Sequence, residues 1–446
     1  MCSSFNNKVL FQQLVKMTWP MMFGVLSLMS FQLVDSAFIG QLGVLPLAAQ
    51  GFTLPIQMII IGTQVGLGIA TTALIARALG SSNYLYSKQL GGLILTIGTL
   101  GIGLLCGLIW LLRDPILNLL SAPDTVYPVI ESYWPLWLVS AWTGAVLYFY
   151  YSICRANGNT MLPGVMMVVT SIINMILDPL FIFTMDLGIN GAALATIVSF
   201  GLGILVVAPK VVQRNWVSFQ WQDLNIIQSL RSLANIMGPA MISQLLPPLS
   251  SMLATKLLAT YGTAAVAAWA LGSRFEFFSI VVVLALTMSM PPMIGRLLGA
   301  GKIEEIRRLV VIACQFIMAF QLIVAIASFL LSAQLADLMT SDKQVEDILN
   351  WHLMIVPLSL GPLGICMLMV SVSNALAKAY TALLISALRL FVFFLPCLSL
   401  GAYIAGIHGL FVGVLVGNIL AGLCAWFIYS RIINQILHEA NTNQST

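Results

Sequence analysis

The residues of this chain best suited to chemistry are two carboxylic acids inside long apolar segments. Asp35 lies in the segment 14–38, and Asp178 lies in the segment 160–184, four residues after Asn174. Residues four apart share one face of a helix, so Asn174 and Asp178 should lie one above the other. A charge at membrane depth costs about 3 kcal/mol on insertion scales, so both acids should face protein or water and are candidates for function.

A hydroxyl at matching depth extends this set. Asp178 lies about 12 Å along its helix from the turn expected outside the membrane, and Thr196 lies about 9 Å beyond that turn. Asp35 also lies in the outer part of its segment. The sequence therefore predicts one coupling site built from Asp35, Asn174, Asp178 and Thr196.

Such a site could bind a proton or a sodium ion. Two carboxylates in one poorly solvated pocket cannot both ionise cheaply, because desolvation and mutual repulsion disfavour the second charge. One acid poised to gain and lose a proton is what a proton-coupled carrier needs, whereas the same oxygens, with an amide and a hydroxyl, could coordinate sodium. A purely structural role for Asn174 and Asp178 in helix packing is the third interpretation.

Pro20 shares a segment with Asp35. Proline removes a backbone donor and kinks a helix, although neighbouring groups can repair the lost bond inside a membrane protein. The two residues are 15 positions apart, about 22 Å along the axis, so a proton at Asp35 can reach Pro20 only through the helix. We expect a hinge at Pro20, with a fixed packing kink as the alternative.

A second group of charges lies in the other half of the chain. Lys256, Arg274 and Glu276 fall inside apolar segments, near the expected outside face. Lys256 could pair with Glu276, or the two basic side chains could extend to the outer interface while their stems stay apolar.

The composition is that of a polytopic membrane protein. Sixty per cent of the residues are apolar and 8% are charged, against about 25% charged in soluble domains. The chain has no Gly-rich phosphate loop followed by Lys-Ser or Lys-Thr, no Cys-x-x-Cys pair and only three histidines, so we expect no cofactor, no metal and no enzyme active site. Turn-rich breaks leave twelve helix-length apolar segments: 14–38, 47–79, 89–111, 129–154, 160–184, 190–212, 234–259, 267–298, 307–332, 348–373, 382–405 and 410–434.

The basic residues predict an orientation. If the N-terminus is cytoplasmic, fourteen of the 19 basic residues face the cytoplasm and only Arg113 and Lys343 lie outside, with three inside segments. Because cytoplasmic loops are enriched in Lys and Arg, both termini and the linker at 213–233 should be cytoplasmic.

The chain also matches itself at an offset of 219 residues, which predicts an internal repeat. The matches include Pro20 with Pro239, Gly43 with Gly262, Arg77 with Arg296 and Gly80 with Gly299. We expect an all-α protein with an N-terminal lobe at 1–212, a linker at 213–233, a C-terminal lobe at 234–434 and a polar tail at 435–446. Each lobe holds six helices of the same orientation, so the two should be related by an axis along the membrane normal. The lobes differ in chemistry, since Asp35 matches Ala254 and Glu276 matches Gln57.

Several motifs resemble the multidrug and toxic compound extrusion (MATE) family over nearly the whole chain. They are Pro20 with Asp35, FIGQLGVLPLAAQG at 38–51, IARALG at 75–80, RANGNT at 155–160, INMILDPLFIF and LGINGAALAT at 173–196, YGTAAVAAWA at 261–270 and IGRLLGAGK at 294–302. The resemblance implies two six-helix lobes around a central cavity, and export of drugs in exchange for protons or sodium.

Within that family the chain is similar to the DinF-type branch. In that branch the first-lobe acids and their polar neighbours carry coupling, which falls on Asp35, Asn174, Asp178 and Thr196 here. The NorM-type branch adds acids in the seventh and tenth helices. Here the seventh segment has Lys256 and no acid, and the tenth has Ser371, Ser373 and Asn374, so a second-lobe cation site of that type is not expected.

The resulting hypothesis is an inner-membrane antiporter that expels drugs or toxic amphiphiles, often cationic, in exchange for protons. Sodium coupling is the alternative within transport, and a flippase for lipid-linked precursors on a related fold is an alternative of another class. We expect small-molecule substrates, a surrounding lipid bilayer, no nucleic-acid partner and a monomeric state.

Overall fold

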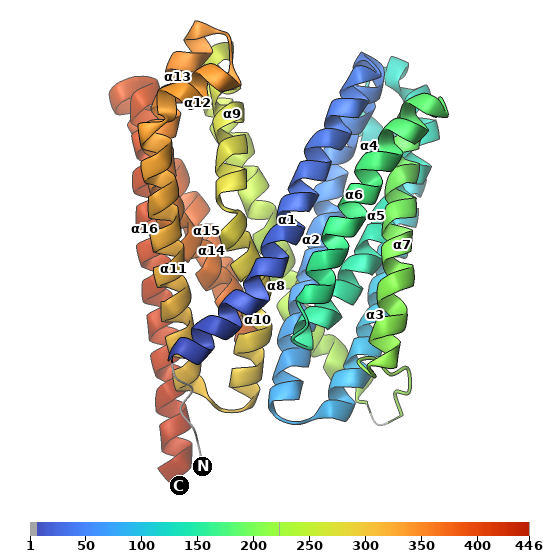
Figure 1. Ribbon diagram of the computed structural model, residues 1–446, viewed down its shortest axis with the longest axis vertical. Helices are drawn as coiled ribbons and strands as arrows, with labels where there is room; N and C mark the ends of the chain where they lie inside the picture. The colour runs from blue at the N-terminus through green and yellow to red at the C-terminus, as the bar shows by residue number, and fades with distance from the viewer. Residues whose placement is uncertain (1–6, 223, 446) are drawn as a thin grey trace. The chain divides into compact units, whose positions relative to one another are not determined.

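The computed structural model describes residues 7–222 and 224–445, with side chains as far as residue 439, and in this part of the chain every regular element is helical (Figure 1). Residue 223 of the predicted linker, Cys2 and both chain ends lie outside the described residues. The α-helices are α1 (Asn7–Gln41), α2 (Val44–Gly80), α3 (Tyr84–Leu111), α4 (Arg113–Leu119), α5 (Tyr127–Ala156), α6 (Met161–Pro179), α7 (Ile189–Gln213), α8 (Ile226–Leu258), α9 (Thr263–Ser279), α10 (Val281–Gly299), α11 (Ile303–Leu330), α12 (Ser332–Met339), α13 (Lys343–Ile355), α14 (Leu360–Ala375), α15 (Ala379–Ala387) and α16 (Leu395–Ser445).

Short 3₁₀ and π-helical segments lie between or at the ends of these α-helices. Three are 3₁₀ turns, η1 (Asp124–Val126), η3 (Ala259–Tyr261) and η4 (Val356–Ser359). Two are π-helical, η2 (Leu180–Thr184) and η5 (Leu388–Phe394). Such turns often mark functional positions inside helices.

Ten helical stretches of the described residues are long and apolar enough to cross a membrane. The difference from the twelve predicted segments has two causes. The segment 234–259 forms α8, which is long enough but interrupted by serine, glutamine and proline side chains. The segments 382–405 and 410–434 fall within one continuous stretch, Ala379–Glu439, and count together.

That stretch contains a sharp break. Ala405 (φ −137°, ψ 26°) and Gly406 (φ 61°, ψ −141°) are not helical, so α16 consists of two helices joined at this point. Glycine tolerates the positive φ. The helical arms on the two sides of the break pack closely against each other. A Cβ atom at Gly401 would collide with the carbonyl oxygen of Gly409, and a Cβ atom at Gly413 would collide with that of Cys397. The two predicted segments are therefore an antiparallel helix pair.

The chain divides into two compact units. The N-terminal unit is Trp19–Met241, and the C-terminal unit combines the chain up to Thr18 with the chain from Ile242 onward. In the N-terminal unit α5 packs against α2, α3 and α7, and in the C-terminal unit α14 packs against α10, α11 and α16.

These boundaries differ from the predicted lobes at 1–212 and 234–434. The first turns of α1 belong to the C-terminal unit, where the Thr18 and Ser289 hydroxyl oxygens lie 2.8 Å apart. The first turns of α8 belong to the N-terminal unit, where the backbone of Met237 and Met241 packs on Gly66. A long helix can contact more than one helix bundle along its length, which cutting at polar segments does not detect. The lobe boundaries in the membrane stay a prediction.

Candidate ion-coupling site

Asn174 links two elements of the N-terminal unit. Both Asn174 and Asp178 are fully buried on α6. In the amide orientation that pairs both of its polar atoms, Asn174 Nδ2 donates to Asp178 Oδ2 at 2.9 Å, and the amide oxygen accepts from the Thr196 backbone N–H at 3.2 Å. The Thr196 hydroxyl lies 3.1 Å from the same oxygen. The amide thus holds the Asp178 carboxyl against α7.

Asp35 of α1 completes the predicted group. Its carboxylate lies close enough to Asp178 and to Tyr133 of α5 to interact electrostatically with both. Oδ1 of Asp35 is buried and has no hydrogen-bond partner among the described residues. A buried acceptor without a partner is costly, so this oxygen is a natural place for an added proton or ligand.

Local helix breaks set this geometry. Pro179 directly follows Asp178 and cannot donate to the helix ladder, and the chain continues as the π-helix η2, closed by the Met185 N–H donating to the Leu180 carbonyl at 2.9 Å. At the start of α7, a Cβ atom on Gly191 would lie 2.6 Å from the Phe181 carbonyl carbon. Only glycine allows this approach, which brings Thr196, one and a half turns later, beside Asn174.

Pro20 lies where α1 meets α6. The helix α1 runs continuously through Pro20. A Cβ atom at Gly164 of α6 would collide with the Pro20 carbonyl oxygen, and one turn on, a Cβ atom at Gly24 would lie 2.9 Å from Met167 Sδ. The boundary between the two compact units, after Thr18, falls two residues before Pro20.

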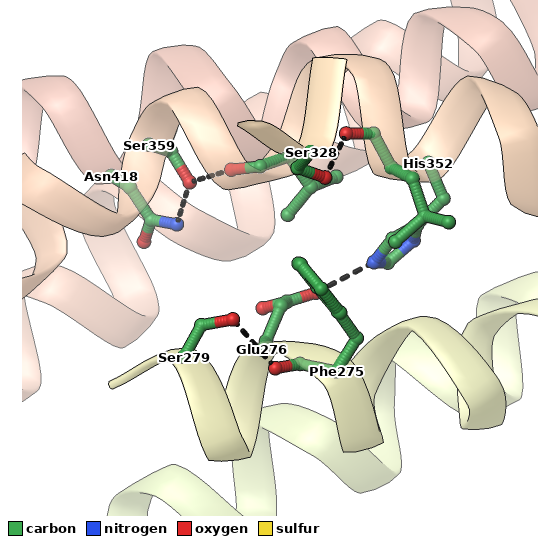
Figure 2. A network of polar contacts seen from close by, with 9 residues as sticks. Phe275, Glu276, Ser279, Ser328, His352, Ser359 and Asn418 are labelled. Carbon is green, nitrogen blue, oxygen red and sulfur yellow. Dashed lines mark hydrogen bonds and ion pairs between the residues drawn. The ribbon is translucent and has the colours of Figure 1, made fainter. Parts of the chain in front are cut away.

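Of the charged residues in the second half of the chain, Glu276 contacts a residue for which the sequence predicted no role. Glu276 Oε1 of α9 lies 2.7 Å from Nε2 of His352 on α13, as Figure 2 shows. Lys256 and Arg274 are exposed, and among the described residues neither forms an ion pair with Glu276. A lone histidine inside the apolar segment 348–373 was the available signal, but its partner lies 76 residues away.

No group of three or more His, Cys, Asp or Glu side chains able to hold a metal ion occurs among the described residues. A sodium site of carboxylate, amide and hydroxyl oxygens, as Asp178, Asn174 and Thr196 would supply, is a different donor set and stays a hypothesis.

A family model described as MatE matches residues 20–180 and 239–398. The two matches begin 219 residues apart, the same offset as the repeat seen in the sequence. Among curated proteins, the chain is 31% identical over 433 residues to the FAD transporter of Shewanella oneidensis, covering 95% of each chain. It is 24% identical over 431 residues to the multidrug export protein MepA of Staphylococcus aureus, covering 95% of this chain and 94% of MepA.

Solved structures of MATE transporters are also similar to this chain. A crystal structure of the MATE transporter VcmN of Vibrio cholerae with the D35N mutation superposes with a TM-score of 0.95 at 68% identity, covering 96% of this chain and 98% of VcmN. VcmN in the bent form gives a TM-score of 0.94 at the same identity and coverage. The sequence motifs had also pointed to VcmN within the family. A MATE structure at 22% identity shares the fold with a TM-score of 0.91 over 98% of this chain, and such structures have twelve membrane helices in two lobes.

Proposed function

Because this chain belongs to the MATE family, whose model matches both of its halves, we propose that it exports amphipathic, often cationic drugs in exchange for protons. The family consists of transporters, so the chain is a multi-pass membrane transporter and not an enzyme. Multidrug export by MepA, a relative over 95% of this chain, supports drugs as the substrates.

The observation that carries proton coupling is that the acids Asp35 and Asp178 interact electrostatically, while Asp178 is held by the neutral amide of Asn174. Two such carboxylates disfavour a second negative charge, so one of them should cycle between the acid and the carboxylate. Protonated Asp35 can donate a hydrogen bond to Asp178, and ionised Asp35 needs donors or water instead.

Those two states should place the outer half of α1 differently. A helix whose ladder is weakened at Pro20 bends at lower cost than an unbroken one, and the glycines Gly24 and Gly164 flank this point. We therefore propose that protonation of Asp35 selects a bent α1, which narrows the first-lobe cavity and displaces drug. VcmN, at 68% identity, has been crystallised in a form described as bent and with the D35N mutation, which supports the idea.

Inner-membrane location with cytoplasmic termini is part of the proposal. Fourteen of the 19 basic residues face the cytoplasm in this orientation, as loop charge asymmetry requires. A cysteine at Gln222 should react with an impermeant thiol reagent only from the cytoplasmic side. Labelling from outside intact cells would contradict the orientation.

Flavin export is a second candidate, favoured by the 31% identity to the FAD transporter of Shewanella oneidensis. FAD carries two phosphate groups, so its export needs a site that accepts negative charge, whereas the acids Asp35 and Asp178 suit cations or protons. The two substrates therefore make opposite demands on the same cavity.

One proteoliposome experiment separates these functions. The purified protein should transport a fluorescent organic cation when a pH gradient alone is imposed and should not do so with a sodium gradient alone. Transport of FAD under the same pH gradient, without transport of the cation, would replace drug export by flavin export. Transport driven only by sodium would replace proton coupling.

A further inference from the structure

Glu276 and His352 meet inside the C-terminal unit, away from the acids discussed above. Their oxygen and nitrogen atoms lie 2.7 Å apart. The imidazole is fully buried, whereas the Glu276 side chain is 20% exposed. A contact this short between a carboxylate and an imidazole contains one proton, which either atom can hold.

The surroundings fix the imidazole in place. A Cβ atom at Gly272 would collide with the His352 ring, so only glycine leaves room for it. The rings of Trp269 and Phe411 stand nearly perpendicular to the imidazole, with centroids 5.4 and 5.1 Å away. Gly272 and Glu276 are one turn apart on α9, so the same helix face supplies both the space and the partner.

The second ring nitrogen of His352 is unusual. Nδ1 is buried and has no hydrogen-bond partner among the described residues. Histidines with a fixed role are commonly held in one tautomer by a hydrogen bond at the other nitrogen. Here Nδ1 leaves an unpaired proton when the ring is charged and an unpaired lone pair when it is neutral. Neither state gains a second hydrogen bond at Nδ1 among the described residues, so no bond at this atom holds the ring in one protonation state.

A charged side chain from a neighbouring element also interacts with the Glu276–His352 pair. Arg389 of η5 interacts electrostatically with Glu276 and can offset the negative charge of a deprotonated pair. From α11 the Ser328 hydroxyl donates to the Leu353 carbonyl, and from α16 the ring of Phe411 packs on the imidazole. Asp337 of α12 is exposed and interacts with Lys343 instead, and on α9 Arg274 is exposed.

We propose that Glu276 and His352 form a second proton-binding site, in the C-terminal unit, that takes up one proton and releases it during the transport cycle. The partly exposed carboxylate exchanges the proton with water, and the buried imidazole shares it. This site deepens the proposed proton-coupled export and rests on that function for its place in the cycle. It comes from α9 and α13, so it does not use the acids of the seventh and tenth helices that the NorM-type branch carries.

The backbone next to His352 can respond to such a proton. Pro357 of η4 cannot donate to the Leu353 carbonyl, and the Ser328 hydroxyl takes this place at 2.7 Å. Further along, Asn418 Nδ2 donates to the Ser359 hydroxyl at 3.0 Å. The Ser328 hydroxyl of α11 therefore replaces one backbone donor immediately after His352, and Asn418 of α16 supports the Ser359 side chain, as Figure 2 shows. A shift of α13 need not break a continuous helix at this point.

Histidine NMR on the full-length protein in lipid nanodiscs tests the site directly. The chain has three histidines, and the ring carbon between the two nitrogens reports protonation when it is labelled. The resonance lost in His352→Gln should shift as the pH is varied between about 5 and 9, because the proposed site takes up a proton. In Glu276→Gln its midpoint should move by about one pH unit or more, a tenfold change in proton affinity. The matched control is His408→Gln, whose ring packs on Trp351, and it should leave the His352 resonance unchanged.

A His352 resonance that does not change across this range, or one with the same midpoint in Glu276→Gln, would overturn the proposal and leave a structural contact. Should Glu276→Gln not fold, Gly272→Ala gives a second test, because displacing the ring must shift the midpoint. The titration does not depend on transport. A titrating His352 in a protein that exports no drug would refute the proposed function alone, and active drug export with an unresponsive His352 would refute this site alone.

Discussion

The acid cluster of the N-terminal unit and the Glu276–His352 pair of the C-terminal unit are both proposed to bind a proton, but different side chains surround the carboxylate in each. In the first, the Asn174 amide donates to Asp178 and accepts from Thr196, and Asp35 adds a second acid. In the second, a histidine and a neighbouring arginine surround one acid. A proton therefore removes repulsion between two acids in the first site, whereas in the second it joins a single carboxylate that also interacts electrostatically with Arg389. We expect the first site to dominate coupling and the second to adjust it.

The largest effect should come from Asp35→Asn. The amide keeps the shape of the side chain and loses the titratable proton, so pH-driven export should fall by about a hundredfold or more, in the range of a lost acid–base group. His352→Gln should reduce export only about fivefold, near the value of one net hydrogen bond, since the Glu276 carboxylate remains able to bind a proton. Dye export from proteoliposomes with matched protein content measures both. Equal losses in the two variants would remove the distinction between the two units.

Asp178→Asn should follow, with export reduced by about tenfold, the value of a hydrogen bond to a charged group. The substitution removes one of the two acids and leaves Asp35 without the neighbour that disfavours its charge. The pH at which export is half-maximal should therefore change as well as the rate. A reduced rate with an unchanged pH profile would show that Asp178 only packs, which is the structural interpretation.

The amide between the acids can be separated from the hydroxyl beyond it. Asn174→Leu leaves the Asp178 carboxyl without its donor and the Thr196 backbone N–H without its acceptor, so export should fall by about fivefold. Thr196→Val keeps the backbone N–H and removes the hydroxyl alone, so a change of at most about twofold is expected. If Thr196→Val instead matched Asn174→Leu, the hydroxyl would be a ligand, and sodium coupling would gain support.

The sequence predicted the parts of these two sites that lie on neighbouring helices, because residue counting along a short connection fixes their relative depth. Asp178 and Thr196 lie on consecutive α-helices joined by a short connection, so counting residues from the expected turn was enough to match their depths. His352 and Glu276 lie on helices that are not consecutive, and no residue count fixes their relative rotation. Apolar length and turn-rich breaks predicted the helices and the break near Ala405–Gly406, whereas the shared helices α1 and α8 depend on packing along their full length, which no local pattern shows.

A small effect should also come from Pro20→Ala, which tests whether the first unit needs movement at all. Alanine restores the backbone donor, so α1 should become straighter and stiffer while Asp35 keeps its neighbours Asp178 and Tyr133. Export should fall by about threefold, a cost near that of one net backbone hydrogen bond, since every bend must now break it. The matched control is Pro55→Ala on α2, which also removes an internal helix proline of the same unit and should leave export unchanged.

Spin labels at Gln32 of α1 and Ile176 of α6, both exposed, should report a distance that changes between low and high pH in the wild type and stays fixed in Pro20→Ala. A fixed distance in the wild type, with full export by Pro20→Ala, would make Pro20 a packing kink. Coupling would then be confined to the acids, and the two units would differ in charge alone.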